Sequence, residues 1–331
     1  ASEAVPFVKT GGLADVVGSL PGYFDKKYFD CRVMLPKYMC IPWELRERLE
    51  YVSHFYMDYL GQSRYVGILK TEYENVTYYF IDNEGYFSGD RPYGNWLYDL
   101  EKFSFFSLAA LSALPVIGFK PDVVHCHDWQ TGLIPVYLKD RFREGEFFRN
   151  MKSVFTIHNL KFQGVWDVDT IKRFSTLPGY YFTEDKLESY KNGNMLKGGV
   201  VYADAITTVS DTYAKEIQTE FFGEGLDGLM RARSNSLRGI VNGIDYREFN
   251  PETDGYIYQK YDAKNFRKEK YKNKTGLQTD LGLEVDEGRF MLGIVSRLTN
   301  QKGLDLVRCV IDEICQEDTQ LVVLGTGDEE Y

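Results

Sequence analysis

The stretch Pro121-Asp-Val-Val-His-Cys-His-Asp-Trp129 places β-branched and apolar residues directly before a charged and an aromatic side chain. We predict a strand over Asp122–Cys126, because β-branched residues are typical of strands, and a polar turn after it. Ligands of open parallel sheets bind at the carboxyl ends of the strands. His127, Asp128 and Trp129 stand at that end and form the first candidate site.

Further strands are predicted on both sides of this stretch, over residues 31–35, 77–81, 153–157 and 205–209. The apolar density of residues 103–114 predicts a helix that ends before Pro115. Ser210 is placed to cap a helix that continues through Ile217. Strands that alternate with helices indicate an α/β fold with a parallel sheet.

A second polar strand end follows at Thr156–Gly164, which contains His158 and Asn159. A histidine there can donate hydrogen bonds to hydroxyl groups or transfer a proton. A single loop histidine is more often structural. Two adjacent strand ends, each with a histidine and an amide or carboxylate partner, favour a functional site.

A zinc site is the alternative interpretation of the same residues. His125 and His127 share one face of an extended strand, and a His-x-His pair with His158 and Asp128 could bind zinc in a metal-dependent hydrolase. Such an enzyme would leave the basic residues near the C-terminus without a role.

Two glycine-bearing basic segments stand near the ends of the chain. Lys9-Thr-Gly-Gly-Leu13 leads into a helical pattern that stops at Pro21-Gly22. Glycines let backbone amides approach a phosphate, although Gly-Gly before a helix is more often only a tight turn. Ser296–Gly303 carries Arg297 and Lys302 between a predicted strand and helix. Arg can bind a diphosphate bidentately, while Lys adds a point charge; a solvated basic loop is the alternative.

Composition limits the partners and the compartment. The formal net charge of −10 argues against nucleic acid as the main partner. No apolar run reaches the about 18 residues of a membrane span. Five cysteines without close pairing fit a reducing compartment, either a bacterial cytoplasm or a plastid stroma. The aromatic loop Tyr93–Trp96 could contact a sugar or simply pack.

The length of 331 residues favours two domains. We expect an N-terminal Rossmann-like domain over residues 1–250 and a linker region over residues 251–285. Residues 286–331 are predicted to form one strand–loop–helix–strand unit, the opening of a second domain whose remainder is expected beyond residue 331.

Six segments together resemble the bacterial glycogen synthases and plant starch synthases, the ADP-glucose-using glucan synthases of the retaining GT-B class. The order and spacing of these segments match across nearly the whole chain. The matching text is Ser2–Leu20, His125–Trp129, Thr156–Leu160 with Gln163-Gly164, Tyr202–Ser210, Val241–Asp245 and Ser296–Asp305.

The resemblance implies two Rossmann-like domains that face a cleft, and transfer of glucose from ADP-glucose to the non-reducing end of an α-1,4-glucan with retention. It implies no metal or other cofactor, because cations of the protein stabilise the departing diphosphate. A non-catalytic glucan-binding fragment or an inactive paralogue is the alternative. Oligomeric state stays undetermined.

The resemblance also assigns roles to individual residues. Lys9 and the amides of Gly11 and Gly12 would belong to the donor site, and Arg297 and Lys302 would hold the diphosphate. The remaining assignments concern the sugar: His158 near the reacting centre with Asn159 beside it, Asp128 and Trp129 around the sugar pocket, and Asn242 against the donor glucose.

Three departures from the family pattern are evident. The family begins with a strand before Ser2-Glu-Ala, and Pro21–Tyr28 departs from the usual helix ending. The family's Glu-x7-Glu segment and second Thr-Gly-Gly loop are expected after residue 331. We therefore expect the 331-residue chain by itself to be inactive.

Overall fold

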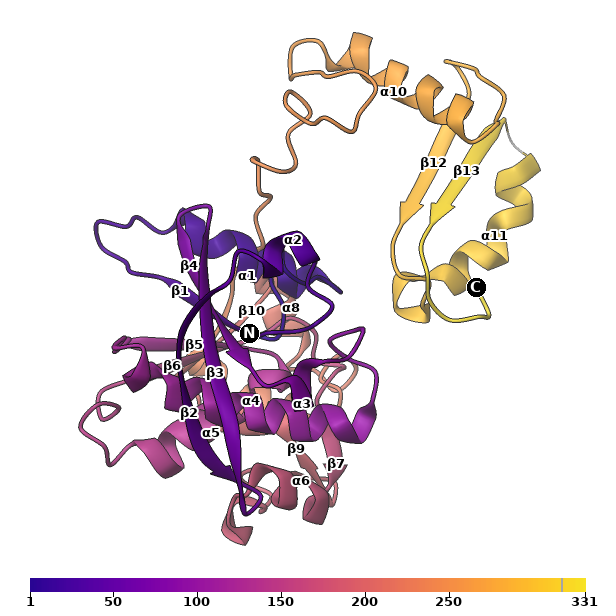
Figure 1. Ribbon diagram of the computed structural model, residues 1–331. Coiled ribbons are helices and arrows are strands. Elements are labelled where there is room, and N and C mark those ends of the chain that lie inside the picture. The colour runs from indigo at the N-terminus through magenta and orange to yellow at the C-terminus, as the bar shows by residue number, and fades with distance from the viewer. Residues whose placement is uncertain (317) are drawn as a thin grey trace. The chain divides into compact units, whose positions relative to one another are not determined.

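A computed structural model describes residues 1–316 and 318–331, apart from the side chain of Trp96 (Figure 1). The chain divides into two compact units, Ala1–Gly243 and Ile244–Tyr331. No helix in the described part is long and apolar enough to cross a bilayer.

The first unit contains a four-stranded parallel sheet in the order β11-β10-β6-β5. Its strands are β5 (Val123–His127), β6 (Lys152–Ile157), β10 (Ala205–Thr208) and β11 (Leu237–Gly239). The predicted strands around residues 122–126, 153–157 and 205–209 are thus confirmed, and their carboxyl ends lie at one edge of one sheet.

A second four-stranded sheet, in the order β1-β4-β3-β2, is mixed rather than parallel. The predicted β1 (Arg32–Pro36) and β4 (Val76–Asp82) pair in parallel, whereas the long strands β2 (Glu50–Tyr59) and β3 (Gln62–Tyr73) add antiparallel partners. Neither β2 nor β3 was predicted from the sequence. Both connecting turns have two residues with positive φ, Leu60-Gly61 and Glu74-Asn75, which is the type I′ geometry that matches strand twist.

Two proline predictions were wrong. Helix α1 (Gly12–Tyr23) continues through Pro21, and α4 (Trp96–Val116) continues through Pro115. Both prolines lie in the last turn, where the missing N–H costs one hydrogen bond and no later turn depends on it. α4 also begins at Trp96, seven residues before the predicted 103, and the Oδ1 of the preceding Asn95 caps it by accepting from the Tyr98 N–H.

Short elements complete the first unit around the buried α4, which packs against α5, α6, β2 and β4. The helices are α2 (Trp43–Arg46), α3 (Glu84–Phe87), α5 (Leu133–Tyr137), α6 (Val168–Ser175), α7 (Met195–Tyr202), α8 (Asp211–Glu216) and α9 (Asp227–Ala232). The small sheet β7-β9-β8 consists of Val165–Asp167, Asn192–Asn194 and Glu188–Ser189. As predicted, Ser210 caps α8, with its Oγ accepting from the Tyr213 N–H at 2.9 Å.

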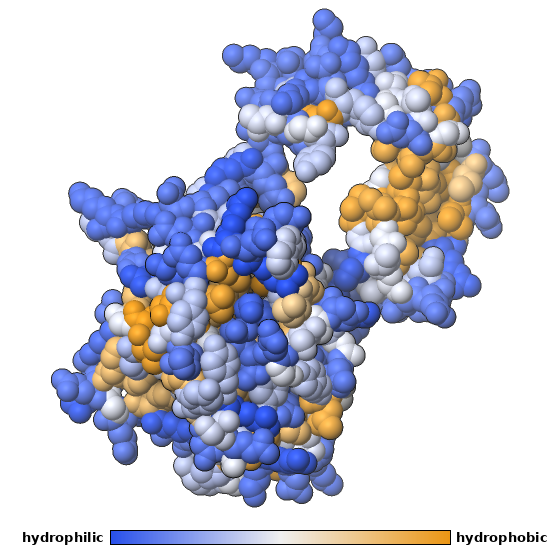
Figure 2. All heavy atoms as spheres, viewed as in Figure 1, coloured by the Kyte–Doolittle hydropathy of each residue, from blue (hydrophilic) through white to orange (hydrophobic). Residues whose placement is uncertain are grey.

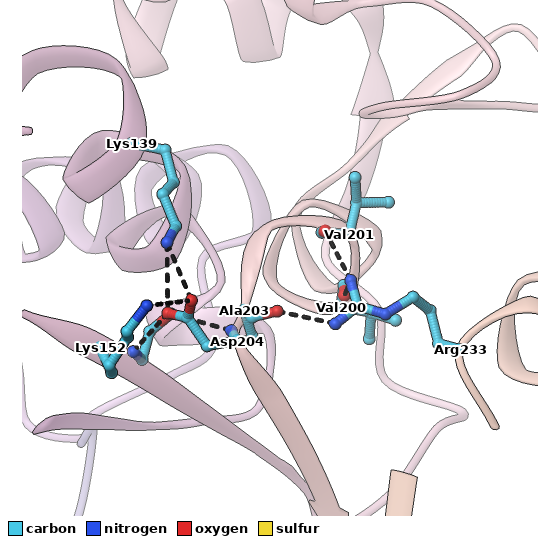
Figure 3. Close-up of polar contacts among 8 residues, drawn as sticks. Lys139, Lys152, Val200, Val201, Ala203, Asp204 and Arg233 are labelled. Carbon is cyan, nitrogen blue, oxygen red and sulfur yellow. Dashed lines mark hydrogen bonds and ion pairs between the residues drawn. The ribbon is translucent and has the colours of Figure 1, made fainter. Parts of the chain in front are cut away.

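The passage from α7 into β10 is fixed by charged side chains (Figure 3). The guanidinium of Arg233 donates to three carbonyl oxygens at the end of α7, those of Val200, Val201 and Ala203, at 2.7–2.9 Å. The Asp204 carboxylate accepts from the Ser153 N–H at 2.8 Å and pairs with Lys139 at 3.0 Å. These contacts hold the start of β10 against β6.

The second unit contains the predicted strand–loop–helix–strand unit: β12 (Phe290–Val295), α11 (Leu304–Gln316) and β13 (Thr319–Leu324), with β12 and β13 parallel. Helix α10 (Phe266–Asp280) lies within the expected linker region 251–285 and joins this unit through the buried amides of Gln278 and Gln320, 2.7 Å apart. Figure 2 shows an apolar surface over β12 and β13, where Val295 and Leu324 are exposed.

Candidate functional site

Polar side chains of three neighbouring strands meet at the carboxyl edge of the parallel sheet. The Thr156 hydroxyl of β6 lies 2.6 Å from His125 Nε2 of β5 and 2.6 Å from the Thr207 hydroxyl of β10. The rings of His125 and His127 are 4.2 Å apart, as expected for residues on one face of a strand. The edge therefore carries a continuous row of hydrogen-bonding groups.

His127 and His158 contact each other across two strand ends. His127 Nδ1 lies 3.1 Å from His158 Nε2. Burial and the nearby charge of His125 lower the pKa of His158 to about 4, and burial lowers the pKa of His127 well below its ordinary value. Both rings are therefore neutral at physiological pH, and their contact needs one ring to donate and the other to accept.

Asp128 is held in an unusual backbone conformation, with φ 54°. Few residues other than glycine adopt positive φ, and such strain is often found at functional sites. The Oδ1 atom of Asp128 accepts a hydrogen bond from the His158 N–H at 2.7 Å. Burial raises the pKa of Asp128 to about 7, against the lowering effect of hydrogen bonds from the backbones of His158 and Asn159. Asp128 thus links the loop after β5 to the loop after β6.

The indole of Trp129 packs against the loop of residues 161–165. It is buried edge-on against Phe103 and Trp166, with ring centroids 5.3 and 5.6 Å away. Gly164 has φ +64°, and a Cβ there would lie 2.6 Å from the indole, so only glycine fits. Trp129 and residues 161–165 line a hollow of about 220 Å³.

The glycine pair at the start of α1 has open space beside it. Gly11 is extended with φ −163°, Gly12 is the first helical residue, and a Cβ on either would touch nothing within 4 Å. Neither backbone conformation nor packing requires glycine here, which favours close approach of a ligand over a turn requirement. Lys9 pairs with Asp15 of α1 at 2.7 Å, and both side chains are partly exposed.

A buried carboxylate that the sequence analysis did not single out supports this loop. Glu3 accepts from the Thr10 N–H at 2.5 Å and from the Thr10 hydroxyl at 3.1 Å. Burial raises the pKa of Glu3, and the bonds from Thr10 oppose that rise. The neighbouring Ser2 hydroxyl lies 2.8 Å from the Tyr93 hydroxyl. The sequence around Glu3 contains no pattern that would have indicated the burial of its carboxylate.

In the second unit, Arg297 and Lys302 lie on the loop between β12 and α11. Both are exposed, and neither forms an ion pair within the described residues. Residues Asn300–Lys302 form a single 3-10 turn, and Gly303 follows with φ +72° before α11 begins. The cations therefore flank the N-terminus of a 13-residue helix.

Two glycines after β13 support the same loop from behind. A Cβ on Gly325 would lie 2.0 Å from the Ser296 carbonyl oxygen, and one on Gly327 would lie 2.0 Å from the Leu298 carbonyl oxygen. Leu298 N–H in turn donates to the Thr326 carbonyl at 2.9 Å. Backbone packs directly on backbone, which fixes the course of the basic loop.

The structure brings some of the expected site residues together. Asp128 and His158 are in contact, and Asn159 follows directly, with its Oδ1 accepting from the Lys161 N–H at 3.1 Å. Glu3, below the glycine loop, lies near enough to Asp128 to raise the pKa of Asp128 further. Asn242 lies exposed on the loop that follows β11.

The zinc alternative gains no support. Within residues 1–316 and 318–331, no group of three or more His, Cys, Asp or Glu side chains is arranged to hold a metal ion. The site histidines contact one another and Thr156 instead.

A family model described as the starch synthase catalytic domain matches residues 1–232. The chain belongs to this family. A glycogen synthase of Lachnospira eligens is 65% identical over the whole chain, which spans 69% of that relative. One of Anoxybacillus flavithermus is 48% identical over the whole chain, which spans 68% of that relative. The catalytic domain of starch synthase IV from Arabidopsis thaliana, solved bound to ADP and acarbose, matches with a TM-score of 0.91 at 30% identity. That match covers 99% of this chain and 68% of the other.

These matches confirm the resemblance and the α/β fold of the GT-B class that the sequence predicted. The chain has the function of a glycogen or starch synthase, a glycosyltransferase that acts on a nucleotide sugar and a glucan. Two groups of polar residues in the described chain now call for a chemical role. One is the strand-end cluster of His125, His127, Asp128, Thr156 and His158. The other is the basic loop Ser296–Gly303 with Arg297 and Lys302.

Proposed function

We propose that the enzyme transfers glucose from ADP-glucose to the non-reducing end of an α-1,4-glucan with retention of the anomeric configuration. The observation that carries the choice of a sugar donor with a diphosphate is the exposed Arg297 and Lys302 beside the start of α11. Two cations at a helix N-terminus match the two negative groups of a diphosphate. The ADP bound to the Arabidopsis starch synthase supports an adenine nucleotide.

Arg297 and Lys302 hold the diphosphate and stabilise the charge that develops on it as the glycosidic bond breaks. Because these cations supply the electrostatic stabilisation, the reaction needs no metal or other cofactor. In the first unit, Lys9 and the amides of Gly11 and Gly12 contact the donor. The open space beside both glycines allows that approach.

His158 contacts the donor glucose near the reacting carbon. Its neutral ring, fixed by His127 and by the Asp128 bond to its backbone, can donate to or accept from a sugar hydroxyl. Asn159 and Asn242 supply amide groups to the same sugar. Asp128 and Trp129 shape the pocket by fixing the two loops rather than by exposing their own polar atoms, since both are buried.

The expected surroundings follow from the same features. The five cysteines are free thiols, which fits a bacterial cytoplasm or a plastid stroma. The acidic net charge speaks against nucleic acid as a partner. We propose glucan and nucleotide sugar as the partners, and no membrane.

Radiolabelled glucose transfer tests the proposal. Full-length enzyme is incubated with glycogen and either ADP-glucose or UDP-glucose, with and without EDTA. We expect label in the glucan from ADP-glucose, unchanged by EDTA, and much less from UDP-glucose. Equal use of both donors would overturn the donor assignment, and loss of transfer in EDTA would overturn the metal-free mechanism. No incorporation at all would overturn the proposed reaction.

A further inference from the structure

The loop of residues 158–162 follows the middle strand of three neighbours in the parallel sheet. β5 pairs with β6 on one side, and β10 pairs with β6 on the other (Figure 1). A loop that leaves β6 therefore has the loops of both neighbouring strands beside it. This loop carries His158 and Asn159, which the proposed function places at the donor glucose.

Two side chains from outside the loop accept its first three N–H groups. The Asp128 carboxylate, which follows β5, accepts from the backbones of His158 and Asn159. The hydroxyl oxygen of Tyr213, a residue of α8 after β10, accepts from the Leu160 N–H at 3.1 Å. The loop is thus held from both neighbouring strands, by a carboxylate on one side and a phenol on the other.

The other two N–H groups of the loop are paired within it. Asn159 Oδ1 accepts from the Lys161 N–H at 3.1 Å, and the Asn159 carbonyl oxygen accepts from the Phe162 N–H at 3.3 Å. A backbone N–H that is kept from water without an acceptor costs free energy. Leu160 is fully buried, so loss of the Tyr213 oxygen would favour a different course of the backbone there.

Both the backbone and the ring of Tyr213 are fixed in place. Its N–H donates to Ser210 Oγ at 2.9 Å, which is the capping bond of α8, and its half-buried ring packs against the core. Burial raises the pKa of the Tyr213 hydroxyl, against the lowering effect of the bond from Leu160, so the phenol stays protonated at physiological pH. It therefore accepts one N–H without placing a second negative charge near Asp128.

We propose that Tyr213 is a positioning residue for glucose transfer, which fixes the loop of residues 158–162 so that His158 and Asn159 meet the donor glucose. The proposal rests on the proposed function for the roles of these two side chains. Misplacement of a reacting group by about 1 Å can lower a rate about 100-fold. The bond to Leu160 lies one residue beyond Asn159, close enough for a shift of that peptide to turn both side chains.

A bond that contributes only to stability is the alternative, and Tyr137 provides the matched control. The Tyr137 hydroxyl donates to the Ser175 carbonyl oxygen at 2.8 Å and so joins α5 to the end of α6. Tyr137→Phe and Tyr213→Phe each remove one hydroxyl that is bonded to the backbone. Of the two hydroxyls, the one of Tyr213 is bonded to the loop of residues 158–162.

The test compares full-length wild-type enzyme with these two variants, in thermal melts and in steady-state transfer from ADP-glucose to glycogen. We expect both variants to melt at slightly lower temperature, because each loses one hydrogen bond. Only Tyr213→Phe should lower kcat, by about 5-fold, with KM for ADP-glucose within about 2-fold of wild type, because the cations that hold the diphosphate are unchanged. Hydrogen exchange followed by mass spectrometry should be faster over residues 158–162 in Tyr213→Phe and unchanged there in Tyr137→Phe.

A wild-type kcat in Tyr213→Phe would overturn the proposal. An equal fall of kcat in both variants would contradict it too, because the cause would then be a general loss of stability. If kcat falls in Tyr213→Phe but exchange over residues 158–162 does not change, Tyr213 does not act through this loop and the proposal is wrong. If wild-type enzyme transfers no glucose from ADP-glucose, the proposed function fails, whereas faster exchange in Tyr213→Phe would still show that Tyr213 holds the loop.

Discussion

In the first unit, His158 and Asp128 hold each other through a short hydrogen bond, and the glycine loop rests on the buried Glu3. In the second unit, Arg297 and Lys302 are exposed and form no ion pair within the described part of the chain. One unit has its polar groups fixed before substrate arrives. The other keeps its charges available.

This difference follows the chemistry of the two substrate parts. Neutral sugar hydroxyls give weak bonds, so selectivity requires donors and acceptors that are already oriented. A diphosphate gives strong charge-assisted bonds, and cations already paired with protein carboxylates would have to break those pairs first. We therefore expect that substituting one of the free cations lowers kcat/KM for ADP-glucose more than removing any single fixed contact of the first unit.

The largest effect is expected for Arg297→Ala. Loss of one bidentate, charge-assisted contact should lower kcat/KM for ADP-glucose roughly 10- to 100-fold, since such bonds contribute about 1.5–3 kcal/mol. Steady-state transfer kinetics measure this, and Lys270→Ala on the exposed side of α10 is the matched control. Equal kinetics in the two variants would show that the basic loop is merely solvated.

Asp128→Asn tests whether the fixed side of the comparison depends on an ionisable group. The amide oxygen can still accept from the His158 N–H, but it cannot ionise. With a pKa of about 7 in the folded state against about 3.9 unfolded, wild-type Asp128 favours the folded state fully below the unfolded value, and this contribution is lost as pH rises through 7.

The stability of Asp128→Asn relative to wild type should therefore rise by about 2 kcal/mol between pH 5 and pH 7. His158 has the opposite dependence, because its lowered pKa costs stability as pH falls below its unfolded value, but it is common to both proteins. Urea unfolding at several pH values gives the difference. A flat difference, like that expected for the exposed Asp58→Asn, would contradict the assigned burial.

A pair of glycine substitutions separates folding from ligand approach. Gly164→Ala should destabilise the protein by roughly 1–2 kcal/mol, because its φ is positive and the new methyl group collides with Trp129. Gly12→Ala meets no atom within 4 Å, so its melting temperature should stay the same or rise while KM for ADP-glucose increases. Thermal melts and donor kinetics are both needed. Equal destabilisation by both changes would remove the argument for open space at Gly12.

The smallest effect is expected for Glu3→Gln. The amide keeps the shape but exchanges a charge-assisted bond to Thr10 for a neutral one, so the glycine loop becomes less well held. We expect a rise in KM for ADP-glucose of about 2- to 5-fold with little change in kcat. Glu47→Gln on the surface serves as control. A fall in kcat without a change in KM would place Glu3 closer to the reaction than the structure indicates.

Much of the parallel sheet could be predicted because short β-branched segments such as 153–157 and 205–209 are bounded by clear turn residues. The β2–β3 hairpin was not predicted, because its turn, Leu60-Gly61, lacks the Asn-Gly or Asp-Gly sequence that usually marks a two-residue hairpin turn. Helix α10 was not predicted either. Its Lys-rich sequence has few apolar residues at helical spacing, so it was interpreted as part of the linker.

Only the approximate location of the candidate site could be predicted, from the polar residues that follow the strands. The position of His127, Asp128 and His158 after apolar strands indicated where polar groups would gather. The bond from Asp128 to the His158 backbone and the burial of Glu3 depend on how separate loops pack, which no local pattern encodes.

The connection between α7 and β10 limits which amino acids the sequence can accept at position 233. One guanidinium meets three carbonyl oxygens there. Lysine carries a single nitrogen on a flexible stem and cannot reproduce that planar fork, so even the exchange that preserves charge at Arg233 would leave helix-end oxygens unpaired. Position 233 is thus a place where substitution tables would predict tolerance and the geometry forbids it.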